Sequence, residues 1–313
     1  SRVASNGMNS NTAVGLEALR DNTSGYLNSA LGTSALLSNT EGFGNTAIGA
    51  HTLRINDLGW SNTAVGQAAM YENTSGYQNT AIGSRSLFMN SSGSANTALG
   101  SSTLARNTTG TYNTAIGTGA LSVSTVGEQN TAIGAQALPR NIDGQRNTAN
   151  GNYAMSENIG GSDNTALGNQ ALFSNISGSM NTGLGAGTDV TQGDLENANA
   201  VGANARVDSS NKIQLGNANV TSVATSGKLT TGDVTYPNSH GTEGQVLGTT
   251  GSGELVWVGT NDIIARHTKE LKEQVASLQE QLTSQQELLA IVQSQQEQIA
   301  QLQRMVEYQF AAK

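Results

Sequence analysis

The chain of 313 residues is polar and mildly acidic, with 36% hydrophobic, 4% aromatic and 12% charged residues and a formal net charge of -8. This composition is not that of an ordinary globular domain, and a chain this polar is often disordered. The polar residues recur at fixed positions, however, which argues against disorder. Because Lys and Arg form no basic patch, the sequence predicts no nucleic-acid partner.

The chain contains no cysteine, which excludes disulfides and thiolate metal sites. No apolar run approaches the ~20 residues that a membrane-spanning helix needs, so we expect no membrane insertion in this fragment. The first residues, Ser-Arg-Val, include neither Met nor an apolar leader. Such a start is typical of a mature or trimmed fragment.

A motif of the form Asn-Thr-Ala-aliphatic-Gly recurs with a constant period of seventeen, and its Asn is counted below as position 1 of the repeat. The motif begins at Asn11, Asn28, Asn45, Asn62, Asn79, Asn96, Asn113, Asn130, Asn147, Asn164 and Asn181. A decayed copy follows, in which Ala198 and Asn199 replace Asn-Thr. A fixed short period predicts a solenoid.

Two glycines recur in each repeat, at positions 5 and 15. Their columns run from Gly15 to Gly202 and from Gly25 to Gly178. Glycine at fixed spacing marks corners where φ is positive or where backbones approach closely. With two such corners, one repeat fits two or three short strands wound into one rung, and rungs would stack through parallel hydrogen bonds ~4.8 Å apart. The stacked motif asparagines would then form an amide ladder along the roll.

Two further columns carry large apolar side chains. Position 4 holds Val14, Leu31, Ile48, Val65, Ile82, Leu99, Ile116 and Ile133, and position 9 holds Leu19, Leu36, Leu53, Met70, Leu87, Leu104, Leu121 and Leu138. We expect both columns to supply the interior, so that Asn150 stands where a core residue is expected. A roll this narrow and rich in Ala would gain from packing against copies of itself, which predicts an oligomer.

From Asn261 to Phe310 the glycines vanish and Gln, Glu and Leu dominate. Apolar residues there follow the 4-3 spacing of a coiled-coil seam: Ile264, Leu271, Val275, Leu278, Leu282, Leu289, Val292, Ile299, Val306 and Phe310. The seam is interrupted by Gln285, Gln296 and Gln303, and Leu288 and Leu302 indicate a shift of phase in its second half. This pattern leaves dimer and trimer open.

A β-rich joint is expected between the repeats and the coiled coil. The segment 211–223, NKIQLGNANVTSV, is typical of strand, turn and strand, and 244–258, GQVLGTTGSGELVWV, of a hairpin. We expect Trp257 to anchor a small core in this joint. The predicted domains are a β-roll head over residues 1–202, a β-rich neck over 203–260 and a coiled-coil stalk over 261–313.

The repeats resemble the heads of trimeric autotransporter adhesins, the YadA-like left-handed parallel β-roll with a repeat of the form Asn-Ser-x-Ala-Ile-Gly. The matching residues are NTAIG at 45–49, 79–83, 113–117 and 130–134. More loosely, the joint and coiled coil resemble phage tail fibres and the mosaic trimeric adhesin fibres of predatory bacteria. The resemblance implies a parallel homotrimer with its rolls side by side on a three-fold axis.

Two departures from that family stand out. The repeat, with its period of seventeen, is longer than the one usual there, which requires larger corner loops. We identify no membrane-anchor barrel and no chaperone-like domain after the coiled coil. The resemblance therefore implies an extracellular or cell-surface bacterial fibre, or a virion tail fibre, and leaves its attachment open.

Titratable residues form no catalytic pattern. The histidines lie in a rung, a loop and the predicted coiled coil: His51, His240 and His267. For His267 we expect a solvated helix face, with an ion site on the trimer axis as the alternative. Three acidic residues cluster where the repeat decays: Asp189, Asp194 and Glu196. We expect a loop that closes the roll, with calcium binding as the alternative, although the spacing is not that of an EF-hand. The sequence thus predicts no catalytic residues, no cofactor and no metal site.

Position 16 carries an aromatic residue in four consecutive repeats: Tyr26, Phe43, Trp60 and Tyr77. Stacked rungs would place these rings in one file at a corner. The structural interpretation is a ladder that stabilises the corner or packs on a neighbouring subunit. The functional interpretation is an exposed stripe that docks sugar rings or a partner surface. These four residues are the candidate ligand-binding site.

Three functions compete. The leading hypothesis is a non-enzymatic trimeric fibre, an adhesin or tail-fibre-like protein, that binds glycans or proteins on a host or prey cell. The alternative is an ice- or mineral-face binder that uses the position 2 column: Thr12, Thr46, Thr63, Thr80, Thr97, Thr114 and Thr131. A polysaccharide-cleaving enzyme is the third, and it lacks a visible acid/base pair.

Overall fold

The computed structural model describes residues 5–6, 9–224, 226, 229–232, 234–237, 241–252 and 254–311. The chain divides into two compact units, Ser1–Val223 and Ala224–Lys313. The first unit is a β-solenoid of about twelve turns of 17 residues, which confirms the predicted roll. The second unit contains a small β region and one long helix. The domain boundaries at 202/203 and 260/261 stay predictions.

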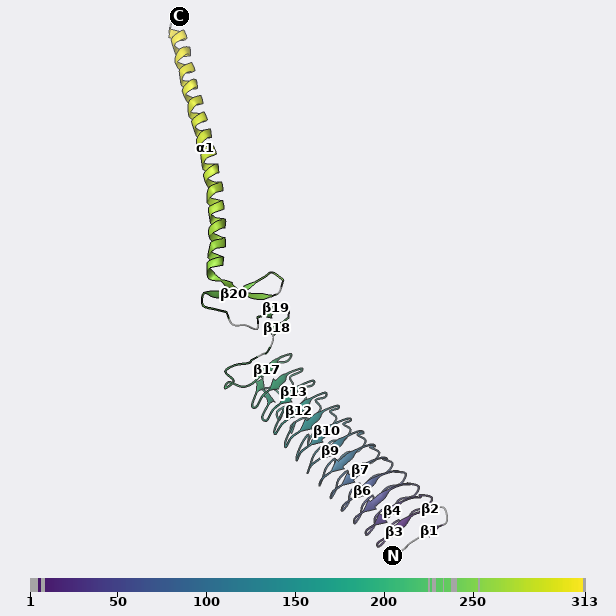
Figure 1. Ribbon diagram of the computed structural model, residues 1–313. Coiled ribbons are helices and arrows are strands. Elements are labelled where there is room, and N and C mark those ends of the chain that lie inside the picture. The colour runs from purple at the N-terminus through teal and green to yellow at the C-terminus, as the bar shows by residue number, and fades with distance from the viewer. Residues whose placement is uncertain are drawn as a thin grey trace. The chain divides into compact units, whose positions relative to one another are not determined.

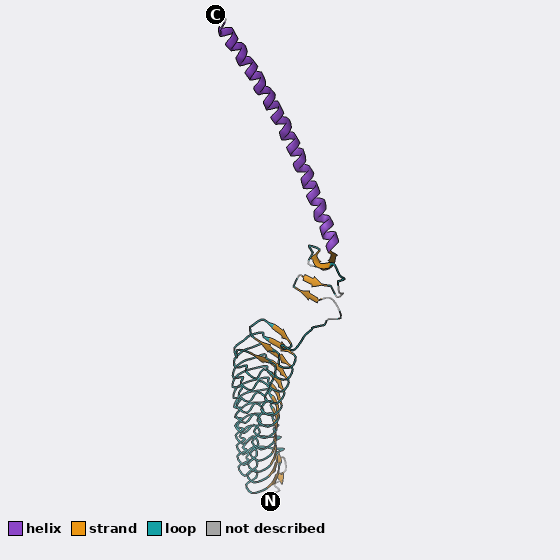
Figure 2. Ribbon diagram, turned by 90° about the vertical axis from the view of Figure 1, so that its left-hand side faces the viewer, coloured by secondary structure: helices purple, strands orange, loops and turns teal. Residues whose placement is uncertain are grey.

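One parallel sheet runs along one side of the solenoid, and loops and turns form most of the rest (Figures 1 and 2). Equivalent repeat positions pair in register, as in Thr46 with Thr63 and Ile48 with Val65. In the described part of this unit the sheet has 13 strands: β3 (Thr12–Val14), β4 (Ser29–Leu31), β5 (Thr46–Ile48), β6 (Thr63–Val65), β7 (Thr80–Ile82), β8 (Thr97–Leu99), β9 (Thr114–Ile116), β10 (Thr131–Ile133), β11 (Thr148–Asn150), β12 (Thr165–Leu167), β13 (Thr182–Leu184), β15 (Asn199–Val201) and β17 (Ile213–Leu215).

The last turn is shorter than the others. Asn199 of β15 pairs with Ile213 of β17, a smaller step along the chain than the one from Thr182 to Asn199. The second strand predicted within 211–223 is wrong, because the chain turns after Gly216 and the backbone N–H of Val220 donates to the Asn217 carbonyl at 3.0 Å. Two short strand pairs form separate sheets: β1 (Ser5–Asn6) with β2 (Asn9–Ser10), and β14 (Asp189–Val190) with β16 (Arg206–Val207).

Most turns contain one strand rather than the predicted two or three. Positions 7, 9 and 17 have positive φ from turn to turn, for example 59° at His51, 47° at Leu53 and 53° at Ser61. Residues in this left-handed region cannot continue an extended strand. Backbone hydrogen bonds still join the turns there, as from Leu53 N to Ala69 O at 2.9 Å. The corners are therefore built largely by non-glycine residues, which the sequence did not indicate.

The two glycine columns have different physical causes. At position 5, Gly49 has a φ of 131°, and an added Cβ would lie 2.7 Å from the carbonyl oxygen of Gly66 in the next turn. At position 15, a Cβ on Gly42 would lie 2.4 Å from both the Gly59 carbonyl oxygen and Oδ1 of Asn39. Position 5 requires glycine both because φ is positive and because the next turn leaves no room for a Cβ. Position 15 requires glycine only because there is no room for a Cβ.

The core is made of alanine and leucine columns, and the prediction that position 4 lies in it is wrong. Ala47 at position 3 and Leu53 at position 9 are fully buried, whereas Ile48 at position 4 is 41% exposed. Side chains alternate along a strand, so positions 2 and 4 point outward when position 3 points inward. Asn150 is accordingly an exposed residue and leaves no gap in the core.

Two ladders of buried asparagine amides run beside this core. In the predicted ladder at position 1, Asn62 Nδ2 donates to the Gly76 carbonyl at 2.8 Å, and Asn62 Oδ1 accepts from the backbone N–H of Asn79 at 3.0 Å. A second ladder, at position 12, was not predicted. There Asn73 Nδ2 donates to Asn56 Oδ1 at 2.6 Å and to the same Gly76 carbonyl at 2.9 Å. Both ladders converge on the position 15 carbonyl, which satisfies polar groups that burial would otherwise penalise.

The second unit has two antiparallel strand pairs, β18 (Leu229–Thr231) with β19 (Val234–Tyr236) and β20 (Gln245–Thr249) with β21 (Leu255–Gly259), followed by helix α1 (Thr260–Ala311). The second pair confirms the predicted hairpin. Trp257 packs on Gly241, where an added Cβ would lie 2.6 Å from the indole ring. The helix of 52 residues confirms the predicted helical segment, and its assembly into a coiled coil stays a prediction.

Ser124 interrupts the position 12 ladder and generates a test of it. Its Oγ and the Oδ1 of Asn107 are buried without a hydrogen-bond partner. The amide of a Ser124→Asn variant would donate to Asn107 Oδ1 and to the Gly127 carbonyl, as Asn73 does in its own turn. Removing unsatisfied buried groups is worth roughly 1–3 kcal/mol, and each kcal/mol raises the melting temperature of a unit of this size by about 2–4 °C.

The measurement is a thermal melt followed by circular dichroism, with Ser124→Ala as the control. The alanine removes the unsatisfied hydroxyl but cannot complete the ladder. The melting temperature of Ser124→Ala should therefore rise less than that of Ser124→Asn. A melting temperature of Ser124→Asn equal to or below that of Ser124→Ala would contradict the stabilising role of the ladder.

Candidate functional site

The four aromatic residues predicted as a site form one continuous file. Tyr26 and Phe43 stack with ring centroids 4.9 Å apart and planes 2° from parallel. Phe43 and Trp60 follow at 5.7 Å and 4°, and Trp60 and Tyr77 at 4.6 Å and 4°. The structure thus brings together all four residues that the sequence singled out.

The corner geometry holds these rings in place. Each ring follows a buried position 15 glycine and precedes a left-handed residue at position 17, such as Ser61 with a φ of 53°. The file ends at Ser94, whose buried hydroxyl accepts a hydrogen bond from the backbone N–H of Tyr77 at 3.2 Å. Because the turns are in register, the spacing of the rings follows the spacing of the strands.

Stacking decides which part of the file a ligand could touch. The inner ring faces cover one another, so a sugar ring cannot insert between them. Tyr26 is 41% exposed and Tyr77 39% exposed, while Phe43 and Trp60 are half-buried. The file therefore offers an exposed stripe of ring edges, and the structural and functional interpretations are compatible.

The outward face of the main sheet is a second exposed surface. It carries the position 2 threonines and, beside them, the position 4 aliphatic residues, all in register. Ile82 is 42% exposed and Ile116 38% exposed. The aliphatic column that the sequence placed inside the roll is thus a stripe along its outer surface, and we call it the outer aliphatic stripe.

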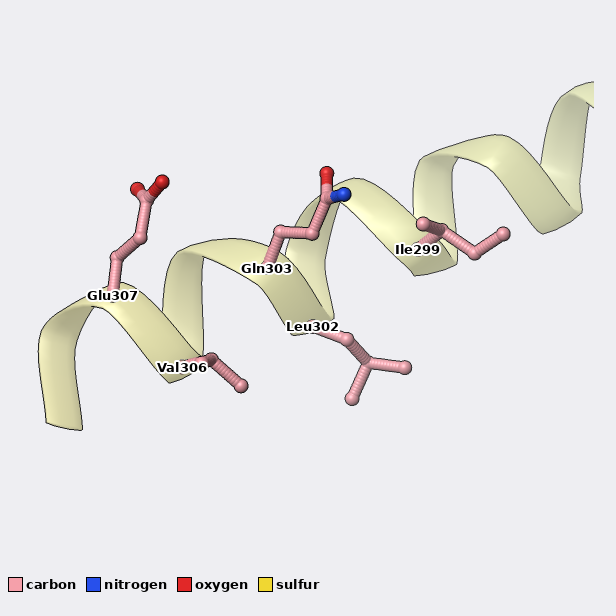
Figure 3. A pocket seen from close by; sticks show the side chains of 5 residues that line it. All are labelled: Ile299, Leu302, Gln303, Val306 and Glu307. Carbon is pink, nitrogen blue, oxygen red and sulfur yellow. The ribbon is translucent and has the colours of Figure 1, made fainter. Parts of the chain in front are cut away.

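The apolar seam of α1 is also exposed. Ile299, Leu302 and Val306 line a shallow hollow together with Gln303 and Glu307 (Figure 3). Leu302 and Val306 point to the opposite side of the helix from Gln303 and Glu307, as an amphipathic helix requires (Figure 3). The rest of the described seam, from Ile264 to Val292, is likewise exposed, and the side chain of Phe310 lies outside the described residues.

The described His, Asp and Glu residues make no candidate metal-binding cluster. No group of three or more His, Cys, Asp or Glu in the described ranges is placed to hold a metal ion. The ring of His51 lies 6.5 Å from that of Tyr71, and His267 Nδ1 lies 3.1 Å from the Ile263 carbonyl within α1. His240 lies outside the described residues. Of the predicted acidic cluster, Asp189 is buried in β14, whereas the other two carboxylates are exposed.

Ion pairs join equivalent positions of successive turns. Arg146 Nε lies 2.6 Å from Asp163 Oδ1, and Arg140 Nη1 lies 2.5 Å from Glu157 Oε2. The hydrogen bond from Arg146 lowers the pKa of Asp163 below its usual value. Both pairs are largely exposed, so they fix side chains along the surface more than they stabilise the fold.

A second aromatic pair was missed by the sequence analysis. Tyr71 and Phe88, both at position 10, stack with ring centroids 5.2 Å apart. Arg54, at position 10 of the preceding turn, donates from Nη1 to the Tyr71 hydroxyl at 2.9 Å. Aligning the repeats at position 10 would have shown these three residues in one column.

No protein-family model matches this chain, and a search of the curated proteins finds no relative. Among the described residues, no helix is long and apolar enough to cross a membrane. The parallel β-solenoid is therefore established by the structure itself, and no family is assigned to it.

The stacked file predicts unequal effects of two serine substitutions. Phe43→Ser breaks two ring contacts, with Tyr26 and with Trp60, whereas Tyr26→Ser breaks one. Each stacked pair contributes about 0.5–1.5 kcal/mol beyond burial, so Phe43→Ser should lower the free energy of unfolding about twice as much. Serine occupies position 16 at Ser94, which makes it compatible with the turn. Urea unfolding followed by fluorescence measures the difference, and equal losses would show that stacking does not stabilise the file.

Proposed function

We propose that this protein is a non-enzymatic homotrimeric fibre that displays a binding surface for glycans or proteins of a host or prey cell. It would work as an adhesin outside the cell or at the cell surface of a bacterium, or as part of a virion tail fibre. The three chains run parallel, with the rolls around a three-fold axis and the helices in a coiled coil.

The observation that carries this proposal is the outer aliphatic stripe. Val14, Leu31, Ile48 and Ile82 repeat the same exposed apolar position in a straight register, turn after turn. An apolar stripe that long is unfavourable in water and favours an interface. A second copy carries the same stripe at the same spacing, so identical rolls match one another turn by turn, apart from the turn with Asn150.

The helix supports the same conclusion independently. Its seam residues are exposed over the described length, and an isolated helix with an exposed apolar seam gains most by pairing with its own copies. Two separate units of one chain thus each present an unpartnered apolar stripe. The resemblance of the repeats to trimeric adhesin heads is our reason for proposing three chains.

Trimerisation would leave the aromatic file available for binding. The rings belong to position 16, outside the strand whose outward residues form the proposed interface. Three copies of the exposed edges of Tyr26 and Tyr77 would then act together, and such avidity makes weak single contacts effective. We therefore assign ligand binding to the file and assembly to the sheet.

The ice- or mineral-face binder is the second candidate, because the structure places the threonine column on the same outward face. Thr63 and Thr80 pair in register and stay at least partly exposed. A lattice-binding face must be open to solvent, whereas an assembly face must be covered. The two functions therefore exclude each other on this surface.

The deciding experiment is the solution mass of the whole chain, measured by light scattering. We expect about three times the chain mass of 32.2 kDa, because the stripe and the seam both favour self-association. A folded monomer would contradict the fibre and move the ice binder to first place, and a thermal hysteresis assay would then test that function.

The same preparation tests the binding surface. Fluorescently labelled protein is applied to bacterial cells and to an array of immobilised glycans. The double variant Tyr26→Ser, Tyr77→Ser should bind less, while Tyr153→Ser, which removes an equally exposed tyrosine at position 7, should not change binding. Unchanged binding by a folded, trimeric double variant would remove the aromatic file from the proposal.

A further inference from the structure

The last two turns of the solenoid depart from the repeat in the wall that faces the sheet across the core. In regular turns position 9 holds a buried Leu or Met at positive φ. Here it holds Asp189 and Arg206, which lie in the extended strands β14 and β16. The neighbouring Val190 and Val207 are fully buried in their place. This change of backbone turns the charged side chains away from the core and leaves a hollow of about 480 Å³.

Asp189 joins residues that line this hollow, and its carboxylate is not available to a ligand. Its Oδ1 accepts from the backbone N–H groups of Ser174 and Val190, both at 3.0 Å. Its Oδ2 accepts from the Ser174 hydroxyl at 2.8 Å and from Nη2 of Arg206 at 3.0 Å. Four hydrogen bonds saturate the carboxylate. Asp189 is therefore a positioning residue for the guanidinium.

Most N–H donors of Arg206 are available to a ligand in the hollow. Its side chain is 61% exposed, and within the described residues its guanidinium makes one hydrogen bond, the one to Asp189. An arginine has five N–H donors in a planar fork that matches a carboxylate. The hydrogen bond to Asp189 thus fixes the orientation of the guanidinium, and it leaves another edge of the guanidinium able to donate to a ligand.

The remaining lining supplies an apolar wall and two amides. Phe173 is half-buried, and the side chains of Gln170 and Asn204 flank the opening at position 7. Between them Gly187 has no side chain, and an added Cβ would lie 2.4 Å from Asn204 Oδ1. Gly187 therefore leaves room for the Asn204 amide at the edge of the hollow.

We propose that this hollow binds a carboxylated pyranose, that is, a hexuronate unit of an acidic polysaccharide. The free edge of Arg206 would pair with the carboxylate, the two amides with ring hydroxyls, and the face of Phe173 with the C–H face of the sugar. No residue of the aromatic file takes part, so this site is independent of the binding surface proposed above. It lies within one chain and away from the outward face of the sheet.

The test is binding of glucuronate to the whole chain, measured by saturation-transfer NMR and by calorimetry, with glucose as the uncharged comparison. Glucuronate should bind at least tenfold more tightly than glucose, because a charge-assisted contact is lost with the carboxylate. Arg206→Gln should remove that preference. Phe173→Ala should weaken both sugars, and Phe88→Ala, the same position in another turn, should weaken neither.

A second variant distinguishes loss of the binding site from misfolding of the chain. Gly187→Gln displaces the Asn204 amide and places at the hollow a side chain that position 7 already carries at Gln136 and Gln170 in the same left-handed conformation. It should abolish glucuronate binding while circular dichroism and the solution mass stay unchanged. Equal affinities for the two sugars, no binding by the native chain, or full binding by folded Gly187→Gln would each overturn the proposal. None of these results bears on the trimer or on the aromatic file.

Discussion

The hydrogen bonding between turns is the constraint on which the rest of the first unit depends. Each turn of 17 residues must return to the same place, so that backbone groups and asparagine amides meet their equivalents in the next turn. The position 15 carbonyl shows the consequence: Gly76 receives amides from both ladders, through Asn62 and Asn73, and has no room for a side chain. Asparagine and glycine recur because this register leaves few other residues that fit.

The same constraint makes the core narrow. Alanine at position 3 faces leucine or methionine at position 9, and polar ladders occupy space that a larger domain would fill with apolar side chains. The roll therefore places its other large aliphatic residues outside, where Ile48 and Ile116 lie. An exposed stripe of this kind is a poor surface for an isolated molecule and a suitable one for assembly, and this links the architecture of one chain to the proposed fibre.

Much of this architecture could be predicted from the sequence, because a repeat period is visible without knowing which residues are in contact. The interval between motif asparagines predicts the turns, glycine spacing predicts close approaches, and loss of glycine after Asn261 predicts the helix. Stacking of Tyr26, Phe43, Trp60 and Tyr77 follows from the same register.

The errors have physical causes too. Apolar residues are usually buried, which predicts an interior position 4, but asparagine and alanine already occupy the inward face of the strand. The left-handed corners carry residues such as Leu53 and Gln78, which show no preference for that conformation in isolation. The sequence shows that the repeat decays near Asp189, but it does not show that the backbone becomes extended there or that a hollow forms beside Arg206.

The central claim is that the outward face of the sheet is covered by copies of the same chain. The chain has no cysteine, so a single introduced cysteine carries the only spin label. Asn150→Cys places the label on the outward face, and Met89→Cys places it at position 11, in the wall across the core. Double electron–electron resonance then measures the distances between labels on different chains. The account predicts a single short distance for residue 150 and a longer one for residue 89. A shorter distance for residue 89, or no coupling at either site, would contradict it.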